Sequence, residues 1–318
     1  MLTRKIGRTD LEVSALCLGG NVFGWTIDEA TSFAVLDTYV QGGGNFIDTA
    51  NVYSAWVPGH SGGESETILG KWMAARKNRE QVIIATKIGM QMGDGKRGLS
   101  RDYILQEVDA SLRRLQTDYI DLYQAHSDDT NTPLEETLGA FNELIKAGKV
   151  RYIGASNYTA ERMAEALGIS LQHHYDRYEC IQPPYNLLNR ATYEKNLEAL
   201  CKEQEISVIT YSSLASGFLT GKYQPRQALP ESQRAQGVQS NYMNEKGFAV
   251  LAQVEEIART HQATPSQVAL AWIIGRPGIT APIASATSVE QTQELLNALN
   301  LRITQEEGEH LDKVSGWH

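Results

Sequence analysis

The stretches NFIDTANVYS (residues 45–54) and VIIATKIG (residues 82–89) each contain an apolar run that ends at an ionisable side chain. The first run ends at Asp48, with Tyr53 five residues later, and the second ends at Lys87. Such nearly continuous apolar runs are typical of parallel strands that are buried on both faces. Eight of them occur along the chain, at residues 14–20, 45–50, 81–89, 118–126, 150–157, 178–186, 207–213 and 281–287.

Segments with helical periodicity separate these runs. In residues 99–116, for example, Ile104, Val108 and Leu112 recur at the spacing of one helical face. The other helical segments are 28–40, 64–77, 133–149, 191–204, 248–260 and 288–299. Strand–helix alternation repeated eight times predicts an α/β fold of the (β/α)₈ TIM barrel type. The alternative, a doubly wound sheet, normally carries a GxGxxG motif in its first βα turn, and none occurs there.

Three further features complete the predicted architecture. The opening segment RKIGRTDLEV (residues 4–13) is interpreted as a β-hairpin ahead of the barrel. Residues 221–247 are rich in Gln, Ser, Pro and Gly and predict a long polar loop after the seventh strand, of the kind that is usually functional or disordered. No linker divides the chain, so we expect residues 1–318 to form a single domain.

Composition excludes several function classes. The net charge of −9 without a Lys/Arg-rich run argues against a nucleic-acid or anionic-membrane surface. No apolar run approaches the roughly 18 residues of a membrane span, and the N-terminus lacks the apolar core of a signal peptide. The three widely spaced cysteines, Cys17, Cys180 and Cys201, suggest reduced thiols in a cytoplasmic protein. No metal site is expected, because CxxC and HExxH spacings are absent.

Ionisable residues end three consecutive strand-like runs. Asp48, Lys87 and His126 are separated by 39 residues each, which is one strand–helix unit. The active sites of such barrels lie at the carboxyl ends of the strands, so these groups are expected on one rim with Tyr53 nearby. Taken singly, each has a plain structural explanation, such as a turn cap, a solvated lysine or a packed ring. Together they fit carbonyl reduction, in which hydride transfer leaves an oxyanion that needs a proton.

The roles follow from acid–base chemistry. A phenol has a pKa of about 10, so Tyr53 suits the acid if its pKa is lowered toward neutrality. Lys87 beside it is expected to lower that pKa, and Asp48 to hold the lysine in place. His126 is expected to orient the carbonyl oxygen by a hydrogen bond.

The chain resembles the aldo-keto reductase family along nearly its whole length. The resemblance rests on FIDTANVYS, ESETILG, IIATK, DLYQAH, VRYIGASN, QPPYNLL and YSSLASGFLTGKY. It implies a catalytic tetrad of Asp48, Tyr53, Lys87 and His126, with Tyr53 as the acid/base. It also implies a nicotinamide cofactor covered by the loop after the seventh strand.

The resemblance further implies cofactor contacts at the remaining strand ends. Ser156, Asn157 and Gln182 correspond to residues that hold the nicotinamide carboxamide, and Tyr211 to the one that stacks on its ring. The small residues of SSLASG (212–217) fit a wrapping of the pyrophosphate by backbone N–H groups. The full expected set is Gly20, Asn21, Asp48, Ser156, Asn157, Gln182, Tyr211, Ser212, Leu214, Ser216, Gly217, Leu219, Lys222, Arg234, Ser285, Thr287, Gln291 and Glu294.

Departures from the family pattern affect the adenosine end and the substrate end. The Lys and Arg that clamp the adenosine phosphate in many relatives are Ser285 and Gln291 here. The branch that includes the potassium-channel β subunits also has Gln at the Arg position and carries a Lys equivalent to Lys222. NADPH is still expected because of Lys222 and Arg234, with NADH possible. The substrate is expected to be a small carbonyl compound, in a pocket lined by Trp25, Trp56 and His60.

Two other functions compete with reduction. One is a nucleotide-binding regulatory subunit of the channel-associated type, against which His126 is an argument because those relatives commonly replace it. The other is a barrel aldolase with Lys87 as a Schiff base, although a lysine paired with Asp48 is a poor amine nucleophile. The sequence leaves open the substrate, the direction of the reaction and the oligomeric state.

Overall fold

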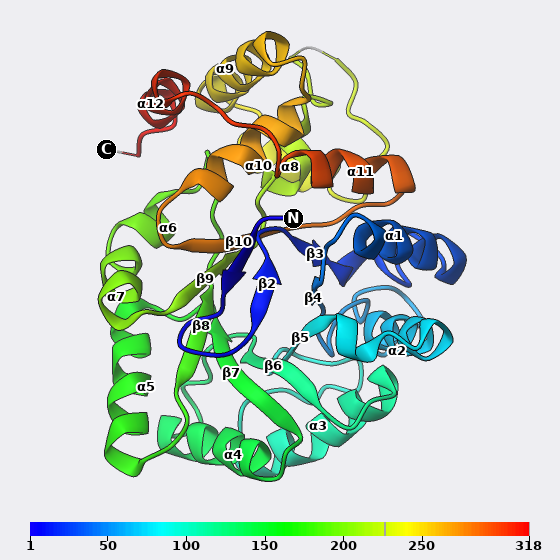
Figure 1. The fold of residues 1–318 in the computed structure, drawn as a ribbon, viewed down its shortest axis with the longest axis vertical. Helices are drawn as coiled ribbons and strands as arrows, with labels where there is room; N and C mark the ends of the chain where they lie inside the picture. The colour runs from blue at the N-terminus through cyan, green and yellow to red at the C-terminus, as the bar shows by residue number, and fades with distance from the viewer. Residues whose placement is uncertain (226, 318) are drawn as a thin grey trace.

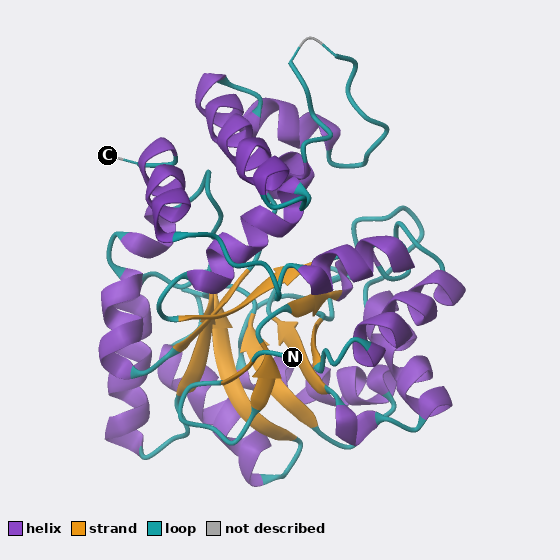
Figure 2. Cartoon of the chain, turned by 45° about the horizontal axis from the view of Figure 1, so that its top comes forward, coloured by secondary structure: helices purple, strands orange, loops and turns teal. Residues whose placement is uncertain are grey.

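Eight parallel strands close into a barrel in the computed structural model, which describes residues 1–225 and 227–317. Each strand pairs with the next along the chain, and the last strand, β10, pairs with the first, β3. Figure 2 shows these strands as the inner layer, surrounded by helices. The barrel strands are β3 (Cys17–Gly19), β4 (Phe46–Asp48), β5 (Ile83–Ile88), β6 (Ile120–Ala125), β7 (Val150–Ser156), β8 (Tyr178–Gln182), β9 (Ser207–Thr210) and β10 (Ile279–Ala284).

Helices form the outer layer, as Figure 1 shows in a view along the barrel. The short turns at residues 20–22, 79–81 and 215–220 are 3₁₀ helices. The α-helices are α1 (Glu29–Gln41), α2 (Glu64–Arg76), α3 (Arg101–Leu115), α4 (Leu134–Lys146), α5 (Ala160–His173), α6 (Ala191–Glu194), α7 (Leu197–Gln204), α8 (Ala235–Tyr242), α9 (Glu245–Thr260), α10 (Pro265–Gly275), α11 (Val289–Asn297) and α12 (Gln305–Val314). None of these helices, within the residues just stated, is long and apolar enough to cross a membrane.

The N-terminal hairpin lies across one opening of the barrel (Figure 1). Strands β1 (Thr3–Lys5) and β2 (Glu12–Ser14) pair antiparallel, and three apolar side chains from this segment pack onto the barrel interior. These are Ile6, Leu11 and Val13. The predicted barrel and hairpin are thus confirmed, whereas a single domain over residues 1–318 stays a prediction whose last residue lies outside the described part.

The helix between β9 and β10 differs from the prediction. Residues 248–260 do form a helix within α9, but α10 is the helix that packs on β10 and α11. Sequence analysis missed α10 because its residues from Val268 to Ile274 are all buried. A helix that is apolar on every side has no polar stripe to reveal its period.

Two other segments also differ from the prediction, one because its helix is interrupted and one because the expected loop contains a helix. The expected helix 191–204 is two helices, α6 and α7, interrupted near Asn196. The expected polar loop 221–247 contains α8, and residue 226 within it lies outside the described part. Val238 of α8 is fully buried, so part of that segment belongs to the core.

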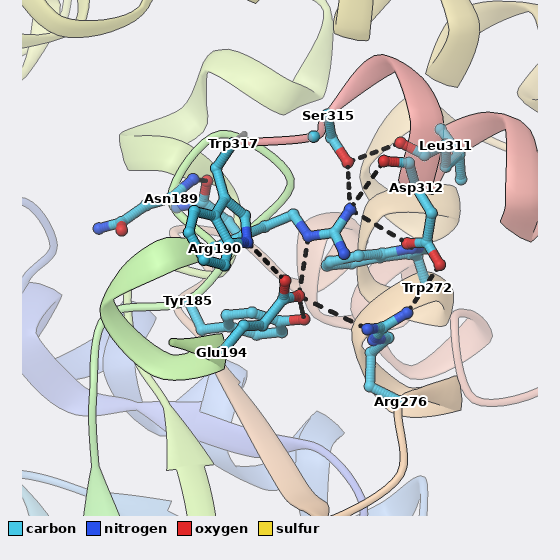
Figure 3. A network of polar contacts seen from close by, with 12 residues as sticks. Tyr185, Asn189, Arg190, Glu194, Trp272, Arg276, Leu311, Asp312, Ser315 and Trp317 are labelled. Atoms are coloured by element: carbon cyan, nitrogen blue, oxygen red, sulfur yellow. Dashed lines mark hydrogen bonds and ion pairs between the residues drawn. The ribbon is translucent and has the colours of Figure 1, made fainter. Parts of the chain in front are cut away.

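A charged network fixes the C-terminal helix α12 to the barrel (Figure 3). Glu194 Oε1 accepts hydrogen bonds from Arg190 Nε at 2.8 Å and from the Tyr185 hydroxyl at 2.6 Å. Arg190 also donates to the carbonyl oxygen of Asp312 in α12, at 3.0 Å. Trp317 Nε1 donates to the second oxygen of Glu194, at 2.9 Å. This carboxylate therefore joins α6 to the C-terminal segment.

Replacing Glu194 by alanine is expected to lower the free energy of unfolding by about 2–4 kcal/mol, because it leaves largely buried donors unpaired. Urea denaturation followed by circular dichroism measures the change. The control is Glu198→Ala on α7, where no ion pair is formed within the described residues and an effect of at most about 0.5 kcal/mol is expected. Equal effects of the two substitutions would contradict a special role for Glu194.

Candidate active site

A fully buried ammonium group is the centre of the candidate site. Lys87, near the end of β5, donates hydrogen bonds to Asp48 Oδ2 at 2.6 Å, to the Thr49 carbonyl at 2.8 Å and to the Tyr53 hydroxyl at 2.8 Å. Parallel pairing aligns Asp48 of β4 with Ala85 of β5, so both strands bring these residues to the same end of the barrel. The ammonium of Lys87 and its three acceptors thus form one compact cluster.

The phenol of Tyr53 is held in its acid form. Its hydroxyl donates to Asp48 Oδ2 at 3.2 Å while it accepts from Lys87. Burial, followed by the Asp48 carboxylate, raises the pKa of Tyr53 well above its usual value. This shift is opposite to the lowering expected from Lys87 and corrects that expectation. The physical reason is burial of the phenol, to which the Asp48 carboxylate adds at 3.2 Å against the ammonium at 2.8 Å.

His126 completes the cluster from the end of β6. Its ring lies 6.0 Å from the Tyr53 ring, measured between centroids, in an edge-on arrangement. Burial and the neighbouring Lys87 charge lower the pKa of His126 well below 6.5, so the imidazole is neutral. Its Nδ1 is buried and has no hydrogen-bond partner among residues 1–225 and 227–317. Because Nδ1 is buried, a ligand in the cavity would be contacted by the other ring nitrogen, Nε2.

Amide side chains extend the polar surface around the rim. Gln182 Nε2 donates to Asp48 Oδ1 at 2.9 Å, and Ser156 Oγ donates to the Gln182 carbonyl at 2.8 Å. Asn157 Nδ2 donates to the His126 carbonyl at 2.9 Å, while its Oδ1 accepts from the Tyr211 hydroxyl at 2.8 Å. Strands β7, β8 and β9 therefore contribute to the same rim as β4, β5 and β6.

An elongated cavity of about 910 Å³ opens over this cluster. It contains most of the residues expected from the sequence. These are Asn21, Trp25, Asp48, Tyr53, Trp56, His126, Ser156, Asn157, Gln182, Tyr211, Ser212, Leu214, Ser216, Gly217, Lys222, Arg234, Ser285, Thr287, Gln291 and Glu294. Lys87 lies beneath the floor, where Asp48 and Tyr53 cover it.

Three expected residues are not brought to the cavity. The Gly20 carbonyl accepts a hydrogen bond from Ser65 Oγ at 2.7 Å and is buried behind the wall. Leu219 is fully buried in the core. His60, expected in the substrate pocket, instead turns toward Glu64 at the start of α2, with 3.9 Å between Nδ1 and Oε1. The structure thus places these three residues outside the cavity lining, and their contacts with a ligand stay predictions.

The cavity also contains residues that sequence reasoning missed. Thr264, Pro265 and Ser266 line it at the start of α10, the helix that sequence analysis did not predict. Met90, just after β5, is 37% exposed at the mouth. A methionine three residues beyond a strand-ending lysine was the signal available for it.

The segment after β9 has a backbone suited to an anion. Ser212, Ala215 and Ser216 adopt positive φ angles of 56°, 50° and 56°, and Gly217 follows at 93°. Left-handed conformations in a turn can direct backbone N–H groups toward an anion, while the amides of Ala215 and Gly217 here donate to the carbonyls of Ser212 and Leu214. Gly217 suits its φ of 93° because it has no Cβ atom.

Two cations border this segment without carboxylate partners. Neither Lys222 nor Arg234 forms an ion pair within the described part of the chain. The Arg234 guanidinium lies 5.7 Å from the centroid of the Trp25 ring. Burial and the Arg234 charge lower the pKa of the Lys222 ammonium, which shows that the cations repel each other. A bound anion would relieve this repulsion.

The far end of the cavity is already connected by hydrogen bonds. Ser285 Oγ donates to Asn21 Oδ1 at 2.6 Å, and Gln291 Oε1 accepts from the Thr287 amide at 2.8 Å. Glu294 accepts from Thr264 Oγ1 at 2.7 Å. The contact between Thr264 and Glu294 joins the start of α10 to α11 at this end of the cavity.

Aromatic rings wall the opposite end. The centroids of Trp25 and Trp56 lie 5.3 Å apart, and those of Tyr53 and Trp56 lie 6.1 Å apart, both edge-on. Trp56 is 49% exposed, which is unusual for so large an apolar ring. The acid of the cluster therefore lies beside an apolar surface that faces solvent.

Comparison with known proteins agrees with this geometry. The family model described as "Aldo/keto reductase family" matches residues 15–315. The uncharacterized oxidoreductase YrpG of Bacillus subtilis is 35% identical over 95% of this chain and 92% of its own length. Protein tas of Escherichia coli is 34% identical over 96% and 95%, and a probable voltage-gated potassium channel subunit beta of Arabidopsis thaliana is 33% identical over 95% and 92%. The chain belongs to the aldo/keto reductase family.

Proposed function

We propose that this protein reduces an aldehyde or ketone to an alcohol, with NADPH as the hydride donor and Tyr53 as the proton donor. The observation that carries the proposal is the buried cluster of Tyr53, Lys87 and Asp48 at the floor of the cavity, with His126 beside it. When bound, the cofactor supplies the hydride. A cytoplasmic location, suggested by the three free cysteines, is part of the proposal.

Each residue of the buried cluster has its own role in the proposed reaction. Tyr53 transfers its hydroxyl proton to the carbonyl oxygen as negative charge develops there, and Lys87 stabilises the phenolate that results. Asp48 holds the ammonium in place through the 2.6 Å ion pair. The neutral imidazole of His126 orients the carbonyl oxygen by a hydrogen bond.

The residues of the cavity fit a phosphorylated dinucleotide. Ser156, Asn157 and Gln182 would hold the carboxamide, and Tyr211 would stack on the nicotinamide. Residues 212–217, with Lys222 and Arg234, would hold phosphate groups. Asn21, Ser285, Thr287, Gln291 and Glu294 would then contact the adenosine end. The support for NADPH over NADH is the unpaired state of the two cations among the residues described, since a 2′-phosphate adds charge for them to bind.

A cofactor-binding regulatory subunit is the second candidate, favoured by the relatives whose names describe channel β subunits. A reductase turns over carbonyl substrates, whereas a regulatory subunit of this kind would bind the cofactor without such turnover. A panel of aldehydes and ketones, followed by the loss of NADPH absorbance, tests the proposal. Cofactor binding without turnover of any carbonyl would overturn it in favour of the regulatory subunit. A Schiff-base aldolase would instead be trapped on Lys87 by borohydride.

Tyr53→Phe is expected to lower kcat by about 10²–10⁴-fold for an unactivated aldehyde, since it removes the proton donor but little volume. NADPH affinity, measured by fluorescence titration, should stay unchanged. The control is Tyr119→Phe at the opposite end of the barrel, where Tyr119 packs under Arg79. Retention of most of the turnover by Tyr53→Phe would remove Tyr53 from the acid role.

Lys222→Glu is expected to weaken NADPH binding by tenfold or more, because a charged hydrogen bond contributes about 1.5–3 kcal/mol. NADH binding should weaken less if the lost contact includes the 2′-phosphate. Fluorescence titration with both cofactors measures the ratio, with Lys202→Glu on α7 as the control. An unchanged ratio of the two affinities would exclude Lys222 from selecting the phosphorylated cofactor.

Trp56→Ala is expected to change the ranking of substrates by kcat/KM rather than the chemistry common to all of them. Aromatic aldehydes should lose most, because they lose an edge-on ring partner in a half-exposed wall. Trp56→Phe keeps a ring and serves as the matched variant. The same ranking in wild type and Trp56→Ala would place Trp56 outside the substrate site.

A further inference from the structure

A buried carboxylate lies directly behind the lysine of the candidate active site. Glu66, in the first turn of α2, is fully buried and accepts a hydrogen bond from Thr86 Oγ1 at 2.6 Å. Thr86 immediately precedes Lys87 on β5. Because successive strand residues point to opposite faces, Thr86 faces the helices while Lys87 faces the barrel interior. Glu66 thus contacts β5 at the residue next to Lys87.

Glu66 belongs to a cluster that retains a net negative charge. Its second oxygen accepts from Arg114 Nε at 2.7 Å, and Arg114 also donates to Glu107 Oε1 at 2.6 Å. Two carboxylates therefore share one guanidinium. The phenols of Tyr103 and Tyr123 face the same cluster and are neutral, because burial raises both pKa values, that of Tyr103 to about 12.

The same cluster fixes the end of the loop that carries Tyr53. Gly63 caps α2 with a φ of 90°, and a Cβ at this position would collide with the Arg114 side chain. Arg114 thus packs against the backbone where the loop joins α2. The cluster connects β5, α2 and α3 behind the tetrad, with no member of it lining the cavity.

We propose that Glu66 is a positioning residue for the reaction, which keeps Lys87 charged and holds its strand in place without touching the substrate. The proposal rests on the proposed function. Inside the barrel, Lys87 faces Asp48, Tyr53, His126 and the buried thiol of Cys17. Asp48 is the only anion in that group, since the thiol, phenol and imidazole are neutral. Burial lowers the Lys87 pKa, and the anions around the ammonium oppose this effect, Asp48 first and Glu66 behind the strand in addition.

Glu66→Gln tests the charge while keeping the shape. The glutamine carbonyl can still accept from Thr86, but the negative charge is gone. The alkaline limb of the kcat/KM profile reports loss of the proton held by the Tyr53–Lys87 pair. Removing a nearby anion makes that loss easier, so the limb should move to lower pH by roughly 0.5–1 unit. NADPH affinity should not change.

Glu107→Gln is the matched control, because it removes the same charge from the same arginine but has no hydrogen bond to β5. Its shift should be clearly smaller, and Glu66→Asp, which keeps the charge, should retain the wild-type limb. Coincident profiles for wild type and Glu66→Gln would overturn the proposal, as would an equal shift in Glu107→Gln. If the wild-type protein turns over a carbonyl substrate, either of these results overturns the role of Glu66 alone and the proposed function stands. A wild-type protein without turnover would contradict both the proposed function and the role of Glu66.

Discussion

The burial of one ammonium group constrains the whole site. Lys87 has no exposed surface, and transfer of such a charge from water costs several kcal/mol unless partners replace the lost hydration. An ammonium has three protons, and the structure supplies three acceptors from Asp48, Thr49 and Tyr53. These acceptors come from β4 and the loop after it, so the register between β4 and β5 must hold for the charge to be tolerated.

The sequence predicted this cluster because its members end strands. In a parallel barrel, a residue at the end of a strand has a known position, and the equal spacing of Asp48, Lys87 and His126 placed them on one rim. Loop residues carry no such constraint, and the contact of His60 with Glu64 could not be read from its position in the chain. Helix α10 escaped prediction for a different reason, since complete burial erases amphipathic periodicity. The direction of the Tyr53 pKa shift needed distances that no sequence provides.

The two ends of the cavity differ in how their positive charges are balanced. Around Lys87, positive charge is matched at close range and the groups hold one another rigidly. Around Lys222 and Arg234, no carboxylate of the described chain forms an ion pair with the cations. Burial lowers both pKa values, and the Arg234 charge lowers that of Lys222 further. Uncompensated charge lowers the stability of the protein, so its presence beside a left-handed backbone segment indicates a site whose missing charge comes from a ligand.

The electrostatics of Tyr53 also bear on the direction of the proposed reaction. Reduction consumes a phenolic proton, and a pKa raised by burial and by Asp48 guarantees that the proton is present at neutral pH. The same shift makes the phenol a weaker acid, so proton transfer depends on Lys87, whose hydrogen bond to the phenol oxygen strengthens as negative charge forms there. Alcohol oxidation would require the phenolate at the start, the form that this site disfavours. The raised pKa therefore sets the starting protonation state for each direction at neutral pH, whereas the balance between carbonyl and alcohol is set by their equilibrium and not by the site.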